Sequence, residues 1–269
     1  MRWLSLTDDR ELATTAQAIE RDVPVFLDEL TRAHRTHLAD VAPGLSWVVH
    51  EEELPVATVR ATTLRWDGTS DGAPAAGAGE AVARAGEDGA DTLAVLDVTV
   101  AFGARGRGVG HAVLAELDAR RREQELARTL VLLRPHRKAD YPLIPFDRYV
   151  SFVADDGAPV DPWLRSAWRL GYCPVRGVQR SLQAHADVAS WERWLGLAVP
   201  GSGPYLVDGA IKPVVIEVER DEGRYREPHL WAGASGQPRP PDGEDWIAAL
   251  AAAGVIAGER SHREVRRVR

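Results

Sequence analysis

The sequence predicts an α/β protein built on a mixed sheet, and three stretches of the chain carry this prediction. Residues 92–100 and 129–134 are nearly continuous apolar runs, as is typical of buried central strands. Between them, apolar residues recur at four-residue spacing over 109–117, which predicts an amphipathic helix. A strand, a helix and a strand in this order favour a right-handed parallel crossover. Residues 45–66 form two segments around an acidic turn, the second rich in β-branched residues, and predict an antiparallel hairpin.

The remaining elements follow in order along the chain. Residues 8–39 are expected to be helical, with an interruption at Pro24. Residues 67–91 consist mainly of Gly, Ala and acidic residues without periodicity, and we expect a mobile loop there. A helix is predicted from Asp161, a natural N-cap, to Gly171. The other expected elements are strands at 175–182 and 212–218, a last strand or an extended cover at 224–231, helices at 187–195 and 245–257, and a Pro/Gly linker at 233–244.

The composition argues against several classes of protein, among them nucleic-acid binders, disulfide-bonded proteins and membrane proteins. The chain has 269 residues, of which 45% are hydrophobic, so it can bury a sizeable core. Its net charge of −7 argues against a general nucleic-acid binder. Cys173 is the only cysteine, which excludes an intrachain disulfide and favours a reducing compartment. No apolar run approaches the roughly 20 residues that span a bilayer, and the N-terminus lacks a signal-peptide core. We therefore expect a cytoplasmic protein with neither nucleic acid nor membrane as a partner.

The turn between the first buried strand and the helix is rich in Gly and Arg. Glycines let the backbone approach a ligand closely, and the first N–H groups of the helix are unpaired and lie at its positive end. Arg105 and Arg107 add full positive charges. This layout predicts a site for a phosphate group. The dinucleotide spacing Gly-x-Gly-x-x-Gly is absent, because the third position counted from Gly106 and Gly108 is His111. A Walker-type loop is absent too, since no lysine lies in the turn.

The pattern that remains is Arg105-x-x-Gly108-x-Gly110, after a strand and before a helix. It resembles the pyrophosphate-binding motif of the GNAT superfamily, the acyl-CoA-dependent N-acyltransferases. The resemblance covers roughly residues 45–183. It implies the GNAT fold, a mixed central sheet with splayed parallel strands and flanking helices, here with a C-terminal extension. On this basis we expect three regions, namely a GNAT-like acyl-CoA-binding domain at 1–185, an extension packed on the core at 186–233, and a linker with a short terminal helix at 234–269.

The resemblance also implies a co-substrate, acetyl-CoA or another acyl-CoA, and no metal. Backbone amides of the turn would hold the CoA pyrophosphate, and the end of the first buried strand would lie along the pantetheine arm. The cofactor-binding residues expected on this basis are Val98, Thr99, Val100, Arg105, Gly106, Arg107, Gly108, Val109, Gly110 and His111.

Two catalytic positions follow from the same resemblance. A carboxylate on the first buried strand often serves as the base in the family, and Asp97 is the candidate here. The alternative is a strand-end aspartate that faces solvent. The family often places, where this chain has Ala167, a Tyr that acts as general acid and protonates the leaving thiolate. Tyr172 is therefore taken as the candidate acid, with Tyr149 and Tyr141 as alternatives. CoA thiolate is also a tolerable leaving group without an acid, because an ordinary thiol pKa is about 8.5. A third reading is a protein that binds CoA without turnover.

A basic and aromatic segment, residues 135–149, follows the second buried strand and is expected to form a substrate wall. Arg134, Lys138 and Tyr149 are the candidate substrate-binding residues, since ligands lie at the carboxyl ends of strands in open α/β sheets. A solvated loop with balanced charges is the alternative. The expected function is transfer of an acetyl group to the amine of a small metabolite. The alternatives are an inactive CoA-binding protein and a protein N-acetyltransferase with an open acidic groove. The proline-rich segment would suit a homodimer contact or a lid equally.

Overall fold

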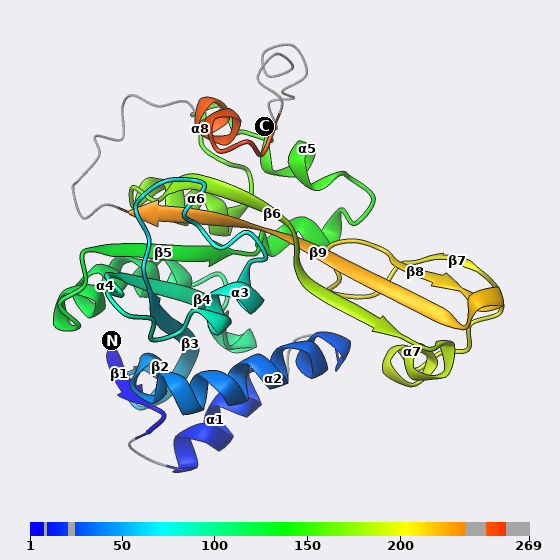
Figure 1. The fold of residues 1–269 in the computed structure, drawn as a ribbon, viewed down its shortest axis with the longest axis horizontal. Coiled ribbons are helices and arrows are strands. Elements are labelled where there is room, and N and C mark those ends of the chain that lie inside the picture. Colours follow the sequence, from blue (N-terminus) through cyan, green and yellow to red (C-terminus); the bar gives the residue numbers. More distant parts are fainter. Residues whose placement is uncertain (8–9, 21–24, 235–245, 257–269) are drawn as a thin grey trace.

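One mixed sheet of nine strands runs through the part of the chain that the computed structural model describes, which is residues 1–7, 10–20, 25–234 and 246–256. Each of its first four strands is antiparallel to the next as far as the fourth, and the fifth is parallel to the fourth (Figure 1). These strands are β1 (Arg2–Ser5), β2 (Ser46–Glu51), β3 (Leu54–Leu64), β4 (Thr92–Val100) and β5 (Arg128–Leu133). The apolar runs over 92–100 and 129–134 thus form adjacent parallel strands, as the sequence predicted.

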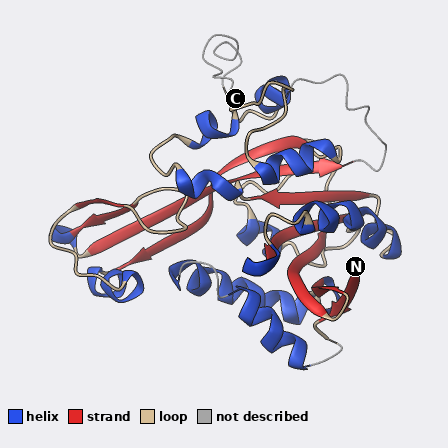
Figure 2. Ribbon diagram, turned by 180° about the vertical axis from the view of Figure 1, so that it is seen from behind, coloured by secondary structure: helices blue, strands red, loops and turns tan. Residues whose placement is uncertain are grey.

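The rest of the sheet is assembled on one long strand, β9 (Glu222–Ala234). At its C-terminal half β9 is antiparallel to β5, and along its length it is antiparallel to β6 (Cys173–Ala186). At its N-terminal end it pairs with β8 (Val214–Glu217), which in turn pairs with β7 (Gly203–Tyr205). Figure 2 shows this end projecting from the rest of the molecule as an arm. Part of the range expected to be an extension is therefore hydrogen-bonded between two strands of the main sheet, while the division into three regions stays a prediction.

Helices flank the sheet. The eight α-helices of the described residues are α1 (Arg10–Glu20), α2 (Val25–Val41), α3 (Ala78–Ala83), α4 (Val109–Glu123), α5 (Phe146–Val150), α6 (Pro162–Arg169), α7 (Val188–Leu195) and α8 (Trp246–Ala252). Short 3-10 turns lie at η1 (Pro43–Leu45), η2 (Phe102–Ala104), η3 (His136–Asp140) and η4 (Val218–Arg220). The predicted N-cap is confirmed, because the Asp161 carboxylate accepts hydrogen bonds from the backbone N–H groups of Trp163 and Leu164.

The prediction of a loop over residues 67–91 is wrong in part. Helix α3 forms inside this segment, and Ala78, Ala81 and Val82 are buried. Small alanines let this helix pack closely on the sheet, so a segment without a clear hydrophobic period still acquires a fixed place. The expected linker at 233–244 and the basic C-terminal end lie largely outside the described residues.

The main core lies between β3, β4 and β5 on one side and α4 and α6 on the other. Helix α4 buries Val109, Val113, Leu114 and Leu117, the apolar face that its sequence period predicted. The C-terminal helix α8 joins the same core through Trp246, whose indole N–H donates a hydrogen bond to the Val150 carbonyl at 2.7 Å. No helix among the described residues has the length and apolar character to cross a bilayer.

Candidate active site

The two parallel strands at the centre of the sheet separate before they end. β4 and β5 pair from Thr92 with Arg128 to Val95 with Val131, and no pairing between them continues beyond that point among the described residues. β4 stays attached to β3 as far as Val100, whereas β5 continues alongside β9. The C-terminal half of β4 therefore has one edge without a strand partner, and its backbone polar groups on that edge can receive a ligand. This is the splay that the resemblance implied.

The Arg-Gly turn follows directly from the free end of β4. Gly106 and Gly108 adopt positive φ values of 74° and 84°, and a Cβ at either position would meet open space. Gly108 is the N-cap of α4 and offers no side-chain oxygen, so the first N–H groups of this 15-residue helix remain directed outward. Arg105 folds back and donates a hydrogen bond from Nε to the Val100 carbonyl at 3.0 Å, and Arg107 forms an ion pair with Glu51. The turn thus combines accessible backbone N–H groups with two nearby cations.

A cavity of about 320 Å³ opens at the splay. Helices α1, α2, α3 and α6 and strands β3, β4, β5, β6 and β9 all contribute to its wall. Of the expected cofactor-binding residues, those that line it are Val98, Thr99, Val100 and Arg105, while the positions from Gly106 to His111 belong to the adjoining turn. Trp163 of α6 closes one side and lies so near α4 that a Cβ on Gly110 would come within 2.9 Å of its ring.

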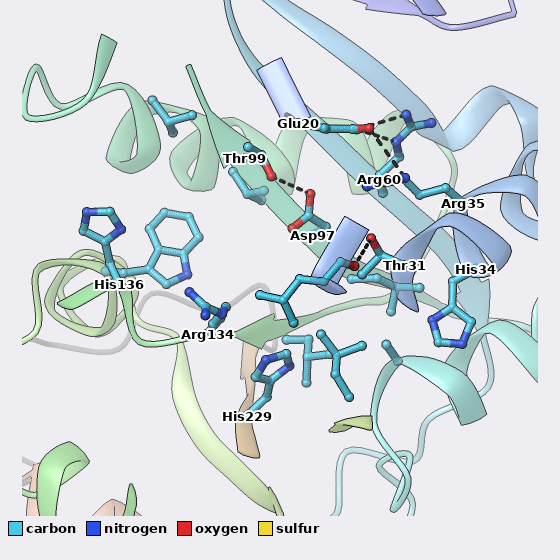
Figure 3. Close-up of a pocket in the computed structure, with 18 of the residues that line it drawn as sticks. Glu20, Thr31, His34, Arg35, Arg60, Asp97, Thr99, Arg134, His136 and His229 are labelled. Carbon is cyan, nitrogen blue, oxygen red and sulfur yellow. Dashed lines mark hydrogen bonds and ion pairs between the residues drawn. The ribbon is translucent and has the colours of Figure 1, made fainter. Parts of the chain in front are cut away.

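Asp97, the predicted base, lines this cavity (Figure 3). It is exposed, and its carboxylate accepts a hydrogen bond from the Thr99 hydroxyl at 2.8 Å. The burial that the apolar strand suggested for this carboxylate is absent, because β4 has already left β5 at this position. Asp97 is therefore available to a ligand, and its role stays a prediction.

A second carboxylate lies on the same side of the cavity. Glu20, the last residue of α1, is buried and accepts two hydrogen bonds from the Arg60 guanidinium, at 3.1 and 3.0 Å, while Arg35 of α2 lies 3.6 Å away. Burial raises the pKa of the Glu20 carboxyl, and the Asp97 charge adds to this, while Arg60 and Arg35 oppose it. Glu20 was not predicted as a site residue, because it lies in an ordinary amphipathic helix with no motif around it.

Arg134 lines the opposite part of the cavity, but its guanidinium already hydrogen-bonds other residues of the chain. Its Nε and Nη2 donate hydrogen bonds to the Glu227 carboxylate at 2.6 and 3.2 Å, and Nη2 also donates to the Gly209 carbonyl at 2.7 Å. The Glu227 carboxylate further accepts a hydrogen bond from the Tyr225 hydroxyl at 2.5 Å, and it lies 2.7 Å from Nε2 of His229. Glu227 is fully buried, whereas His229 lines the cavity. Neither Glu227 nor His229 was found from the sequence.

The other predicted site residues lie outside the cavity wall. Tyr172 is buried behind α4 and donates its hydroxyl to the Leu114 carbonyl at 3.3 Å. Lys138 is fully buried and donates from Nζ to two backbone carbonyls, at 2.7 and 2.8 Å. Burial, helped by Lys212, lowers the pKa of the Lys138 ammonium to about 8. Tyr149 is buried and donates its hydroxyl to Asp161 at 3.0 Å. The structure thus gives all three a partner within the protein and does not bring them to Asp97.

The chain is similar in sequence and in fold to several known proteins. No family model matches the chain. An arginine N-acetyltransferase of Aspergillus versicolor is 31% identical over 157 residues, which cover 52% of this chain and 54% of that protein. The chain therefore spans about half the length of this curated relative. Among solved structures, the GNAT-like decarboxylase GphF in complex with isobutyryl-CoA is similar with a TM-score of 0.54 and 14% identity, over 88% of this chain and 98% of that one. The loading GNAT-like domain of CurA from Lyngbya majuscula is 12% identical, with a TM-score of 0.41 over 74% and 79% of the two chains.

The splayed strands, the Arg-Gly turn and this likeness define a protein of the GNAT fold. The expected resemblance to the GNAT superfamily is confirmed at the level of the fold, including the mixed sheet with flanking helices.

Proposed function

We propose that this protein is an acyl-CoA-dependent N-acyltransferase that transfers an acetyl group to the amine of a small metabolite. The proposal rests on three features that adjoin one another. They are the free edge of β4, the Arg-Gly turn at its end and the cavity between β4 and β5. The printed activity of the relative from Aspergillus versicolor and the acyl-CoA complex of GphF support the same reaction class. The single cysteine supports a reducing, cytoplasmic setting.

The residues present fit acyl-CoA as the co-substrate. Backbone N–H groups at the start of α4 would hold the pyrophosphate, because they are unpaired, lie at the positive end of the helix dipole, and are left uncovered by the glycines. The free edge of β4 at Val98–Val100 would hydrogen-bond the pantetheine arm and direct the thioester into the cavity. A backbone N–H there would stabilise the oxyanion that forms on attack.

The acceptor would occupy the part of the cavity under α1 and α2. A volume of about 320 Å³ suits a small amine better than a protein segment. Asp97 places an exposed carboxylate on one wall, where it could hydrogen-bond a cationic group of the acceptor, whereas the Glu20 charge is already paired with Arg60 and Arg35. Because the relative's printed substrate is arginine, arginine is the first acceptor to test.

Calorimetric titration of acetyl-CoA tests the binding part of this proposal. Gly108→Glu places a side chain and a negative charge in the turn at a position of positive φ, and it should abolish micromolar binding. Gly86→Glu is the matched control, because Gly86 also has a positive φ and open space around it, but it lies after α3, where its N–H bonds to the Thr63 carbonyl of β3. Equal loss in both variants would show that backbone strain alone is responsible. No binding to the wild type at millimolar acetyl-CoA would overturn the proposal.

Product analysis then tests the reaction. Thiol release and mass spectrometry should detect acetylarginine or, in a wider screen, an N-acetylated amine. Tight acetyl-CoA binding without any amide product across the screen would favour the inactive CoA-binding protein instead.

A further inference from the structure

One histidine of the cavity has a hydrogen-bonding atom that the protein does not use. His229 of β9 has only 6% of its side chain exposed and lines the cavity, with its ring near Arg134 in Figure 3. Its Nε2 lies 2.7 Å from the Glu227 carboxylate. Its Nδ1 is buried and has no hydrogen-bond partner among the described residues. A buried nitrogen without a hydrogen-bond partner destabilises the folded state, so a ligand or a chemical role would explain why it is kept.

The surroundings of Glu227 determine which ring nitrogen carries the proton. Burial opposes the charge on this carboxyl, but Arg134 and His229 hold its pKa well below the usual range, so Glu227 is ionised. An ionised carboxylate only accepts hydrogen bonds, and the donors at 2.5–3.2 Å from Arg134 and Tyr225 occupy its remaining positions. Nε2 of His229 must therefore be the donor. In the neutral ring the lone pair is then on Nδ1, the atom without a partner.

We propose that His229 is the general base of the reaction, with Glu227 as the positioning residue that fixes its tautomer. This inference rests on the proposed N-acyltransferase function. The amine nitrogen attacks the thioester carbonyl, and its lone pair forms the new C–N bond. Nδ1 of His229 takes one N–H proton from that nitrogen. The C–S bond breaks with its electron pair on sulfur, and the CoA thiolate gains the same proton from His229, directly or through water.

This assignment accounts for two features that Asp97 and the tyrosines leave open. A single imidazole that first accepts and then donates the proton removes the need for a separate acid at the position of Ala167. It also gives the buried network of Arg134, Glu227 and Tyr225 a function at the cavity, since the network holds one ring in one orientation. His229 and the free edge of β4 both line this cavity.

Two conservative variants separate a chemical role from a structural one. In His229→Gln the side-chain amide N–H can still donate to Glu227, so the network is kept but no base remains. His185→Gln is the matched control, because His185 also lies 3.0 Å from a glutamate, Glu222, but is 65% exposed and outside the cavity. The acceptor is arginine or the first amine that the wild type acetylates. Each variant is measured for its melting temperature, acetyl-CoA affinity, kcat and KM.

We expect His229→Gln to melt near the wild-type temperature and to bind acetyl-CoA equally well, with kcat lower by about 100-fold or more. His185→Gln should retain the wild-type kcat. In His229→Ala, added imidazoles should restore turnover, and the restored rate should rise with the basicity of the imidazole, which simple filling of space would not produce.

Unchanged kcat in a folded His229→Gln variant would overturn the assignment and leave the proposed function standing. So would an Asp97→Asn variant that alone loses turnover. A wild-type protein that acetylates no amine of the screen would instead overturn the proposed function, and the role of His229 with it.

Discussion

Replacing Glu227 by Gln tests whether the buried network contributes to the stability of the protein as well as to the site. The Glu227 carboxylate is fully buried and lies within 3.2 Å of Arg134, Tyr225 and His229. Gln keeps the shape but removes the charge and turns an N–H₂ group toward these donors. Breaking a buried pair in this way costs about 3–5 kcal/mol. Because Arg134 keeps 33% of its side chain exposed, water can compensate part of the loss, and we expect about 3 kcal/mol.

Urea and thermal unfolding measure this loss directly. In a chain of this size 1 kcal/mol corresponds to about 2 °C, so Glu227→Gln should lower the melting temperature by about 6 °C. Arg134→Met should destabilise by a similar amount, because it leaves the buried carboxylate without its cation. The double variant should lose clearly less than the sum of the two single variants, since neither charge then remains unpaired.

The pH dependence of the unfolding free energy tests the same interaction, because its direction follows from the pKa of Glu227. The folded-state pKa of Glu227 lies below its ordinary value of 4.5, so its contribution is present above pH 4.5 and is lost as the pH falls below it. The difference in unfolding free energy between the wild type and Glu227→Gln should therefore shrink below pH 4.5. A loss under about 1 kcal/mol at pH 7 with additive single variants would refute the reasoning, because it would show that the pair adds nothing beyond its desolvation.

The remaining predictions concern residues beside the cavity. The pKa of Lys138 is about 8 in the folded protein against an ordinary 10.5, so the unfolded chain binds more protons between these values and stability should rise with pH there. Lys138→Met should remove this rise, of up to about 1.4 kcal/mol per pH unit, in urea unfolding at pH 8 to 10. Asp161→Ala should cost about 2 kcal/mol in the same assay, since it removes the N-cap of α6; a change under about 0.5 kcal/mol would contradict this. Gly110→Ala should destabilise by about 1 kcal/mol, because contact with Trp163 outweighs the gain in helix propensity; a stabilised variant would show that Trp163 moves freely.

The strand, turn and helix proposed to bind acyl-CoA could be predicted from the sequence, because they follow one another along the chain. The strand, the turn and the start of α4 follow one another within 92–123, and their signals are an apolar run, positive-φ glycines and a four-residue period. Each of these features acts over a few residues, so the order of elements and the position of the turn are confirmed by the structure.

The other side of the site could not be predicted in the same way because its contacts join distant segments. Arg134 and Glu227 are 93 residues apart, and Glu20 meets Arg60 over 40 residues. Lys138 and Tyr149 were predicted from residue type alone, and in the fold their polar atoms bond within the protein. Only the position of β9 beside β5 decides which charged groups face the cavity, and no local pattern encodes that pairing.

One signal in the sequence could have found the network. Tyr225, Glu227, His229 and Trp231 alternate along a predicted strand, so they share one face of it. Four residues with hydrogen-bonding groups on one face need partners or a ligand if that face is buried. The partners of the first three form the network described above, and the Trp231 indole N–H donates to the Pro74 carbonyl at 2.9 Å. Among the described residues, Nδ1 of His229 is the one ring nitrogen on this face without a hydrogen-bond partner.

The two sides of the site are built from different parts of the chain, and this has a consequence for specificity. In the proposed function the turn and β4 would hold the acyl-CoA through backbone groups, so side-chain changes elsewhere should leave its affinity intact. The proposed acceptor side takes its polar groups from α1, from the residue after β5 and from β9, namely Glu20, Arg134 and His229. Substitutions in the cavity faces of α1 and α2 should therefore change which amine is accepted without changing the binding of acetyl-CoA. Substitutions of His229 should not be tolerated in this way, because in the proposed mechanism every acceptor presents its amine to His229.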